Sequence, residues 1–345
     1  METTADAYGL SRVVGTTGFF PQRASRLDPS LPCRESELVV EVESLNIDAA
    51  SFEQIAREAG GDDARIAECV SSIVSERGKM HNPKTGSGGI FIGRVKELGP
   101  RHPARGHLRV GDRIASLVSL SLTPLVIEEI RAVHRDTHRV DVRGHAILFA
   151  SGSYARLPED LSDAVALAAL DVCGAPALVE RHVRPGMTVA VLGAGKGGAL
   201  SLAQARRSLG DTGRLLAIDL HEGSLAELRE HRLCDLTLKL DATRAVEVQE
   251  QVSRATQGTF CDLVVNCVSV QDTEMATILC ARDGGMAIFF SMATSFTSAA
   301  LGADGVSRDV TLLMGNGYVP GHAELTLGLL RSDPGLRRLF ERRYT

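Results

Sequence analysis

The chain of 345 residues is 44% hydrophobic and 23% charged, a balance typical of a soluble globular protein with room for two domains. A formal net charge of −5, 4% aromatic residues and no tryptophan argue against a protein that binds nucleic acids. No apolar run approaches the roughly 18 residues of a membrane span, and the N-terminus lacks a secretory signal. The seven cysteines form no CxxC pair, so we expect reduced thiols, a cytoplasmic location and no structural zinc.

The first half of the chain has the pattern of a β-rich domain with helical insertions. Strands broken by glycine and proline favour a small barrel or an irregular sheet. Asp62 and Asp63 suit the N-terminus of a helix, because a carboxylate there accepts from unpaired backbone N–H groups. We predict strands over 37–47, 89–99 and 110–122, and helices over 51–61 and 62–78.

From about residue 160 the pattern changes to strands that alternate with helices. This alternation is typical of a doubly wound parallel sheet. A helical stretch with a break near Gly174 to Pro176 comes first, and two helices joined by a turn at Asp333-Pro334-Gly335 come last. We predict strands within 184–193 and over 214–220, 236–240, 261–270, 286–292 and 310–318.

A glycine motif lies between the first of these strands and the following helix. Gly193, Gly195 and Gly198 fit G-x-G-x-x-G in the strand–turn–helix context that a dinucleotide site requires. The first glycine permits the tight turn, the second lets a pyrophosphate approach, and the third lets helix and strand pack closely. We place Lys196 with the cofactor-binding residues. A P-loop is disfavoured because Gly197 follows this lysine; a glycine turn without a ligand is the other interpretation.

Polar residues at the ends of later strands extend the predicted cofactor site. Asp219 ends the second strand, where a carboxylate accepts from both ribose hydroxyls and repels a 2′-phosphate, so we predict NAD rather than NADP. Ser269, Ser291 and Thr294 follow later strands, at the edge where ligands bind. They either face the nicotinamide half of the cofactor or simply form turns.

Longer irregular strings in the chain carry a resemblance to known families. GRVKELGP and VGDRIASL, in a β-rich half that precedes a dinucleotide domain, resemble medium-chain dehydrogenases and reductases. Within these, four strings resemble the L-erythro-3,5-diaminohexanoate dehydrogenase family: SLNIDAASFEQI, ERGKMHNPKTGSGG, FFSMATSFTSAALGADGV and MGNGYVPGHAEL. The resemblance implies an α/β fold, with a Rossmann NAD-binding domain over 156–317 and a β-rich, GroES-like barrel substrate domain over 1–155 plus 318–345. It also implies a homodimer.

The same resemblance implies a reaction. It is the NAD-linked oxidative deamination of 3,5-diaminohexanoate to 5-amino-3-oxohexanoate and ammonia, a step of lysine degradation; a relative that acts on another β-amino acid is an open alternative. The zinc ligands of other medium-chain dehydrogenases are not apparent, so we expect no metal. Only a free amine gives up hydride, so a general base is required. The substrate carboxylate needs a cation or N–H donors, and its distal ammonium needs an acidic or carbonyl partner.

Residues 80–89, MHNPKTGSGG, supply groups for this chemistry. His81 is a candidate base or proton shuttle, and Lys84 either holds the carboxylate or acts as the base. Asp48 either orients the base, holds an ammonium or caps a helix. Four further residues are expected to orient the substrate: Asn82, Thr85, Ser87 and Asn316. We expect this segment to fold across the nicotinamide ring; the competing interpretation is an ordinary solvated loop.

Three functions remain open from the sequence. The first is the NAD-dependent amine dehydrogenase on a small diamino acid. The second is a zinc-free, NAD(P)-dependent reductase of carbon–carbon or carbonyl double bonds, and the third is a non-catalytic module that binds NAD. Formation of reduced cofactor with release of ammonia distinguishes the first from the other two.

Overall fold

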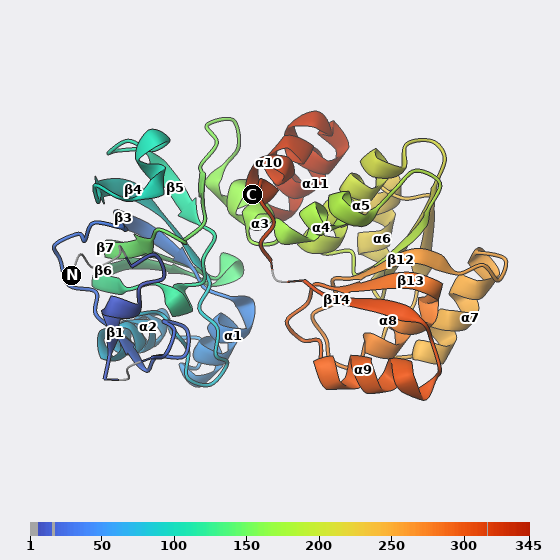
Figure 1. Ribbon diagram of the computed structural model, residues 1–345, viewed down its shortest axis with the longest axis horizontal. Helices are drawn as coiled ribbons and strands as arrows, with labels where there is room; N and C mark the ends of the chain where they lie inside the picture. Colours follow the sequence, from blue (N-terminus) through green and yellow to red (C-terminus); the bar gives the residue numbers. More distant parts are fainter. Residues whose placement is uncertain (1–5, 16–17, 316) are drawn as a thin grey trace. The chain divides into compact units, whose positions relative to one another are not determined.

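The computed structural model describes residues 6–15, 18–315 and 317–345. They divide into two compact units at the bond between Asp160 and Leu161. The first unit contains an antiparallel sheet and the second a parallel one (Figure 1). The mixed α/β fold predicted from the sequence is therefore confirmed. No helix in the described part of the chain is long and apolar enough to cross a membrane.

The first unit is built on a six-stranded sheet in the order β6-β7-β3-β4-β5-β8, with every neighbouring pair antiparallel. Its strands are β3 (Glu37–Asn46), β4 (Ile90–Leu98), β5 (Arg113–Ser116), β6 (Leu125–His134), β7 (Arg139–Phe149) and β8 (Tyr154–Arg156). The pair β1 (Val13–Val14) and β2 (Arg26–Leu27) lies beside it as a separate ribbon, and the helices are α1 (Ala49–Glu58) and α2 (Asp63–Arg77). Short 3-10 turns are η1 (Leu10–Arg12), η2 (Pro103–Gly106), η3 (Leu120–Leu122) and η4 (Arg135–Thr137).

The two helices form at the positions predicted and cover one face of the sheet. Asp62 caps α2, where its side chain accepts a hydrogen bond of 2.9 Å from the N–H of Arg65. Residues of β3 form one continuous core with the buried side chains of α1 and α2, including Leu38, Val40, Phe52, Ile66 and Val70. The apolar spacing that predicted these helices is thus the spacing of their core-facing side chains.

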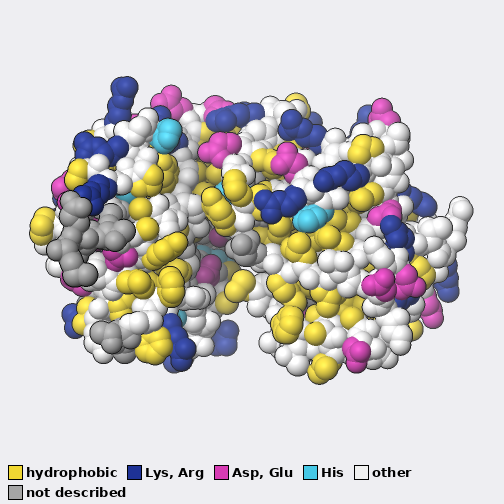
Figure 2. Space-filling model, viewed as in Figure 1, with side chains coloured by type: hydrophobic (Ala, Val, Ile, Leu, Met, Phe, Trp, Pro, Cys, Tyr) yellow, Lys and Arg dark blue, Asp and Glu magenta, His cyan; other side chains and the backbone are white. Residues whose placement is uncertain are grey.

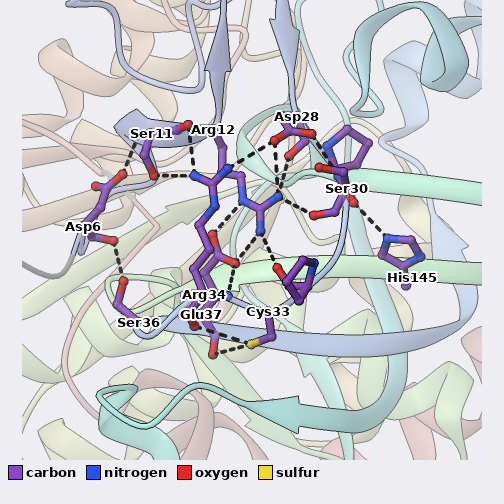
Figure 3. Close-up of polar contacts among 12 residues, drawn as sticks. Asp6, Ser11, Arg12, Asp28, Ser30, Cys33, Arg34, Ser36, Glu37 and His145 are labelled. Carbon is purple, nitrogen blue, oxygen red and sulfur yellow. Dashed lines mark hydrogen bonds and ion pairs between the residues drawn. The ribbon is translucent and has the colours of Figure 1, made fainter.

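A buried arginine ties the N-terminal segment to the sheet (Figure 3). Arg12 is only 1% exposed, and its Nε and Nη2 donate to the two carboxylate oxygens of Glu37 at 2.7 and 2.6 Å. Its Nη1 donates to the carbonyl oxygen of Ser30 at 2.5 Å. A charge buried this deeply persists only when its partners are well placed, so this cluster fixes the path of the chain from η1 to β3.

The second unit is built on a six-stranded parallel sheet in the order β11-β10-β9-β12-β13-β14. The strands are β9 (Thr188–Leu192), β10 (Arg214–Asp219), β11 (Leu236–Lys239), β12 (Cys261–Asn266), β13 (Ala281–Phe289) and β14 (Val310–Met314). This is the strand order of a dinucleotide-binding Rossmann fold, in which the carboxyl ends of the strands share one edge. The strands predicted in this half are all present.

Helices cover both faces of this sheet (Figure 1). The helices that connect the strands are α5 (Lys196–Leu209), α6 (Glu222–Glu230), α7 (Ala245–Ala255), α8 (Glu274–Cys280) and α9 (Phe296–Gly305). Ahead of the sheet come α3 (Asp163–Leu170) and α4 (Gly174–His182), and after it come α10 (His322–Ser332) and α11 (Pro334–Tyr344). The predicted break in the first helical stretch lies at Asp171 to Cys173, between α3 and α4.

The last two helices belong to the second unit, which differs from the domain division expected from the sequence. That division placed 318–345 with the β-rich domain, whereas α10 and α11 pack on α3, α4 and α5. The buried side chains of α10 and α11 include Leu330, Leu336 and Leu339. Asp333 forms the turn between the helices by accepting from the N–H groups of Gly335 and Leu336, each at 2.9 Å.

Candidate active site

The turn between β9 and α5 has the geometry of a nucleotide-binding loop. Gly193 has a φ of 94°, a backbone angle that residues with a side chain rarely adopt. A Cβ on Gly198 would lie 1.7 Å from the carbonyl oxygen of Gly193, so the helix can approach the strand only without a side chain there. A Cβ on Gly195 would meet no heavy atom within 4 Å, so the space beside this glycine is open. The three glycines therefore have the steric features that the motif requires, while their contacts to a cofactor stay a prediction.

Asp219 lies beside this turn at the end of β10. Its Oδ2 accepts from the N–H of Ala194 at 2.7 Å, and its Oδ1 accepts from the N–H of His221 at 2.8 Å. A carboxylate has about four acceptor positions, so each oxygen retains one for a further donor. The placement suits contacts to ribose hydroxyls as well as a structural role in the turn.

Lys196 forms an ion pair with Asp171, so its charge is directed toward the end of α3. The lysine side chain is 34% exposed, which leaves part of it at the surface beside the glycine turn.

Ser269 is exposed after β12, while Ser291 accepts at Oγ from the N–H of Ala293 at 3.1 Å. Thr294 has a buried Oγ1 without a hydrogen-bond partner among the described residues. Ser269, Ser291 and Thr294 lie in the loops that follow β12 and β13, at the edge of the sheet predicted for ligand binding.

In the first unit, Asn82 holds residues 80–89 in a compact loop. The buried Asn82 side chain donates to Gln54 Oε1 at 2.8 Å and accepts from the N–H of Lys84 at 2.9 Å. Its backbone N–H donates to the carbonyl oxygen of Ser87 at 3.0 Å. Asn82 thus shapes the loop, and its predicted contact with the substrate stays a prediction.

A cluster of three hydroxyl groups joins this loop to α1. Ser51 is fully buried, and its Oγ lies 2.5 Å from Thr85 Oγ1 and 2.6 Å from Ser87 Oγ. The sequence predicts a substrate-side role for Thr85 and Ser87, whereas Ser51 looks only like a helix residue. One signal in the sequence points to Ser51: it lies in the string SLNIDAASFEQI, which resembles the family.

Asp48 and Lys84 have different partners around the loop. Asp48 stands at the N-cap position of α1 without a side-chain cap bond, and its Oδ2 accepts instead from the N–H of Gly88 at 3.1 Å. Lys84 is 57% exposed and forms an ion pair with Glu58. Its ammonium beside Glu58 is the main reason why the pKa of that carboxyl is below its usual value.

His81 lies half-buried at the base of the loop, next to the buried Lys79. Burial lowers the pKa of His81, and the charges of Lys79 and Arg77 lower it further. Its Nδ1 is enclosed and has no hydrogen-bond partner among the described residues. Lys79 donates from Nζ to the carbonyl oxygens of Pro21 at 2.6 Å and Gln22 at 3.0 Å. Both effects favour the neutral form of the imidazole, which is the form that accepts a proton.

Asn316 lies outside the described residues, so its predicted role in substrate binding stays a prediction. Tyr318 is 53% exposed and contacts the ring of His322, with centroids 5.2 Å apart. All seven cysteines are free thiols, as expected. Among the described residues, no three His, Cys, Asp or Glu side chains are grouped closely enough to hold a metal ion.

Comparison with known proteins gives two relatives that match almost the whole chain. L-erythro-3,5-diaminohexanoate dehydrogenase of Acetoanaerobium sticklandii is 48% identical over 338 residues, which cover 98% of each chain. The enzyme of the same name from Fusobacterium nucleatum is 45% identical over 340 residues, again 98% of each chain. The chain belongs to the L-erythro-3,5-diaminohexanoate dehydrogenase family.

The model of this family's N-terminal domain, described as "L-erythro-3,5-diaminohexanoate dehydrogenase N-terminal domain", matches residues 11–158. The matched region includes Asp48, Ser51 and the whole loop of residues 80–89. The polar groups gathered at this loop therefore lie within the part of the chain that the family's model describes.

Solved structures of distant proteins share the fold of this chain. A mycobacterial protein in complex with NADPH is 17% identical, covers 92% of each chain and superposes with a TM-score of 0.58. A quinone oxidoreductase of Pseudomonas syringae is 16% identical, covers 92% of this chain and 83% of its own, and has a TM-score of 0.54. At such low identity the likeness establishes the medium-chain dehydrogenase and reductase fold alone, as the resemblance implied.

Proposed function

We propose that this protein catalyses the NAD-dependent oxidative deamination of L-erythro-3,5-diaminohexanoate, or a close β-amino acid, to the 3-oxo acid and ammonia. The observation that supports this most strongly is the 48% identity to a dehydrogenase of that name over 98% of the chain. Since the match covers 98% of each relative, both units of the chain have counterparts in those enzymes.

The glycine turn fits a nicotinamide dinucleotide. The open space at Gly195 and the N-terminus of α5 suit a pyrophosphate, and Asp219 suits the unsubstituted ribose of NAD. NAD would accept the hydride from C3 of the substrate. Ser269, Ser291 and Thr294 are proposed to hold the nicotinamide half. Thr294 supports this, because its buried Oγ1 has no partner in the described part of the chain, whereas buried hydroxyl groups normally have one.

The loop of residues 80–89 is proposed to act on the substrate. His81, whose neutral form is favoured by burial, would take a proton from the substrate ammonium and leave the free amine. Loss of hydride from C3 then gives an iminium ion. Once the base has passed this first proton to solvent, it takes a proton from the water that adds to the iminium carbon and returns it to the nitrogen. The C–N bond then breaks as the hydroxyl proton is lost, which gives the ketone and ammonia.

Charged groups around the loop are proposed to orient the substrate. Lys84 is an exposed cation, so it would hold the substrate carboxylate in exchange for Glu58. Asp48 is proposed to hold the distal ammonium, because one of its oxygens already points to the loop at Gly88. Thr85 and Ser87 would contact the substrate through hydroxyl groups that Ser51 holds in place.

The reaction is proposed to need no metal ion, because a base and a bound nicotinamide are sufficient for hydride loss from a free amine. Activity should therefore survive prolonged dialysis against a chelator. Activity lost on dialysis and restored by a divalent metal would show that a metal takes part.

The protein is also proposed to be a cytoplasmic homodimer. Strand β14 is the edge of the parallel sheet, and hydrophobic side chains lie on the surface over β14 and α9 (Figure 2). Phe296 and Leu301 of α9 are 68% and 67% exposed. Light scattering during size-exclusion chromatography should give twice the mass of the chain; the mass of one chain would contradict the proposal.

The proposed function is tested with a panel of β-amino acids, each incubated with NAD and with NADP while reduced cofactor and ammonia are measured. The 3,5-diamino acid with NAD should be the best pair, with equal amounts of NADH and ammonia. Reduction of quinones or enoyl compounds without any ammonium requirement would favour the reductase alternative. Binding of NAD without turnover of any amine would favour the non-catalytic module.

A further inference from the structure

The peptide that joins Ala194 to Gly195 is held in place from helix α11. Arg343 Nη1 donates a hydrogen bond of 2.8 Å to the carbonyl oxygen of Ala194. The N–H of Ala194 donates to Asp219 Oδ2 at 2.7 Å. Both backbone polar groups of the residue between the first two motif glycines therefore have side-chain partners from other elements.

The guanidinium of Arg343 is itself fixed. Its Nε and Nη2 donate to Oε2 of Glu227, in α6, at 2.8 and 2.5 Å, and the arginine side chain is only 15% exposed. A guanidinium is planar and rigid, so two bonds to one carboxylate set the direction of its remaining N–H groups. Glu227 thus directs Nη1 of Arg343 at Ala194.

Because the peptide bond is planar, the contact to the Ala194 carbonyl also sets the direction of the Gly195 N–H. In a trans peptide, the C=O of one residue and the N–H of the next point in opposite directions. A hydrogen bond from Arg343 to the Ala194 carbonyl therefore turns the N–H of Gly195 away from Arg343. Gly195 is the N-cap residue of α5, where backbone N–H groups and the helix dipole favour an anion.

We infer that Arg343 is a positioning residue for the dinucleotide: through the Ala194 carbonyl it orients the N–H of Gly195 toward the pyrophosphate. Asp219 accepts from the N–H of Ala194, and Glu227 holds the guanidinium of Arg343 in place. The inference rests on the proposed function in requiring a nicotinamide dinucleotide. It does not depend on the choice between NAD and NADP, because the pyrophosphate is common to both.

The test compares three variants by calorimetric titration with NAD and with NADP. Arg343→Gln removes the cation, and Arg343→Lys keeps the charge but loses the planar fork. Arg338→Gln is the matched control, because Arg338 lies exposed on the same helix and has no ion pair among the described residues. Each variant is also melted, and its kcat is measured at saturating cofactor.

Loss of a charge-assisted hydrogen bond should weaken dinucleotide binding roughly tenfold in Arg343→Gln and about threefold in Arg343→Lys. Arg338→Gln should bind like the wild type, and kcat at saturation should be nearly unchanged in all three. If Arg343→Gln fails to fold, the Arg343→Lys result decides. Wild-type affinity in a folded Arg343 variant would overturn the inference.

The same titration separates this inference from the proposed function. A wild-type protein that prefers NADP would contradict the proposed cofactor, yet weaker NADP binding by Arg343→Gln would still support the positioning role. A wild-type protein that binds neither dinucleotide would overturn both.

Discussion

Ser51 and Thr85, which are 34 residues apart in the sequence, place their hydroxyl oxygens 2.5 Å apart and so join α1 to the loop that carries His81 and Lys84. Ser87 joins the same cluster at 2.6 Å from Ser51. Because Ser51 is fully buried, its hydroxyl supports the loop from beneath and leaves the exposed Thr85 available to a ligand.

Replacement of Ser51 by Ala should therefore loosen the loop. Each lost hydrogen bond contributes about 1 kcal/mol, and we expect turnover to fall roughly tenfold while NAD binding is kept. Steady-state kinetics with a parallel NAD titration checks this. Ser75→Ala, on the exposed side of α2, is the control; equal turnover in both variants would contradict a supporting role for Ser51.

Lys84→Ala should reduce turnover and raise the KM of the diamino acid, because the variant lacks the cation proposed to hold the substrate carboxylate. Binding of NAD should be intact. Glu58→Gln removes only the ion-pair partner and should keep most of the activity. Lys96→Ala, at an exposed position of β4, serves as the charge-matched control. Normal kinetics in Lys84→Ala would remove this lysine from the site.

Asp219→Asn should weaken NAD relative to NADP, because it removes the charge that repels a 2′-phosphate. The amide oxygen can still accept from Ala194 or His221, so much of the turn geometry should persist. The ratio of kcat/KM for the two cofactors measures the effect, and we expect a change of roughly tenfold or more. An unchanged ratio would contradict the assignment to the ribose.

Lys79 should make stability rise with pH in the alkaline range. Burial, and then the charge of Arg77, lower its pKa in the folded protein from 10.5 to about 8. Between these values the unfolded chain binds more protons than the folded one, so the free energy of unfolding increases from pH 8 toward 10.5, by about 1–3 kcal/mol.

Urea unfolding at about pH 8 and about pH 10 measures this rise. Lys79→Met should be less stable at both values, since it loses the bonds to Pro21 and Gln22, but its stability should depend less on pH. Lys96→Met should keep the wild-type dependence. The same dependence in Lys79→Met as in the wild type would assign the effect to other groups.

Much of the fold could be predicted because its signals are local. The positive φ of Gly193, the open space at Gly195 and the close contact at Gly198 follow from steric rules that act within one turn, and the structure has all three features. Helix α2 was predictable because its apolar spacing and its cap at Asp62 lie within the segment itself. Strands β6 and β7 lie in a stretch for which no prediction was made.

The remaining features depend on contacts between distant segments. Ser51 looks like an ordinary helix residue until the loop of Thr85 is placed against it. The tail was expected with the β-rich domain, but its apolar side chains pack on α3, α4 and α5, and Arg343 reaches Ala194. No short-range pattern encodes which surface an amphipathic helix covers.

The central claim, that this protein deaminates a β-amino acid with a nicotinamide cofactor, is tested most directly by the reverse reaction. Purified protein is incubated with NADH and 5-amino-3-oxohexanoate, with and without ammonium, and NADH consumption is followed. We predict consumption only when ammonium is present, with formation of the 3,5-diamino acid. Oxidation of NADH at the same rate without ammonium would contradict the account.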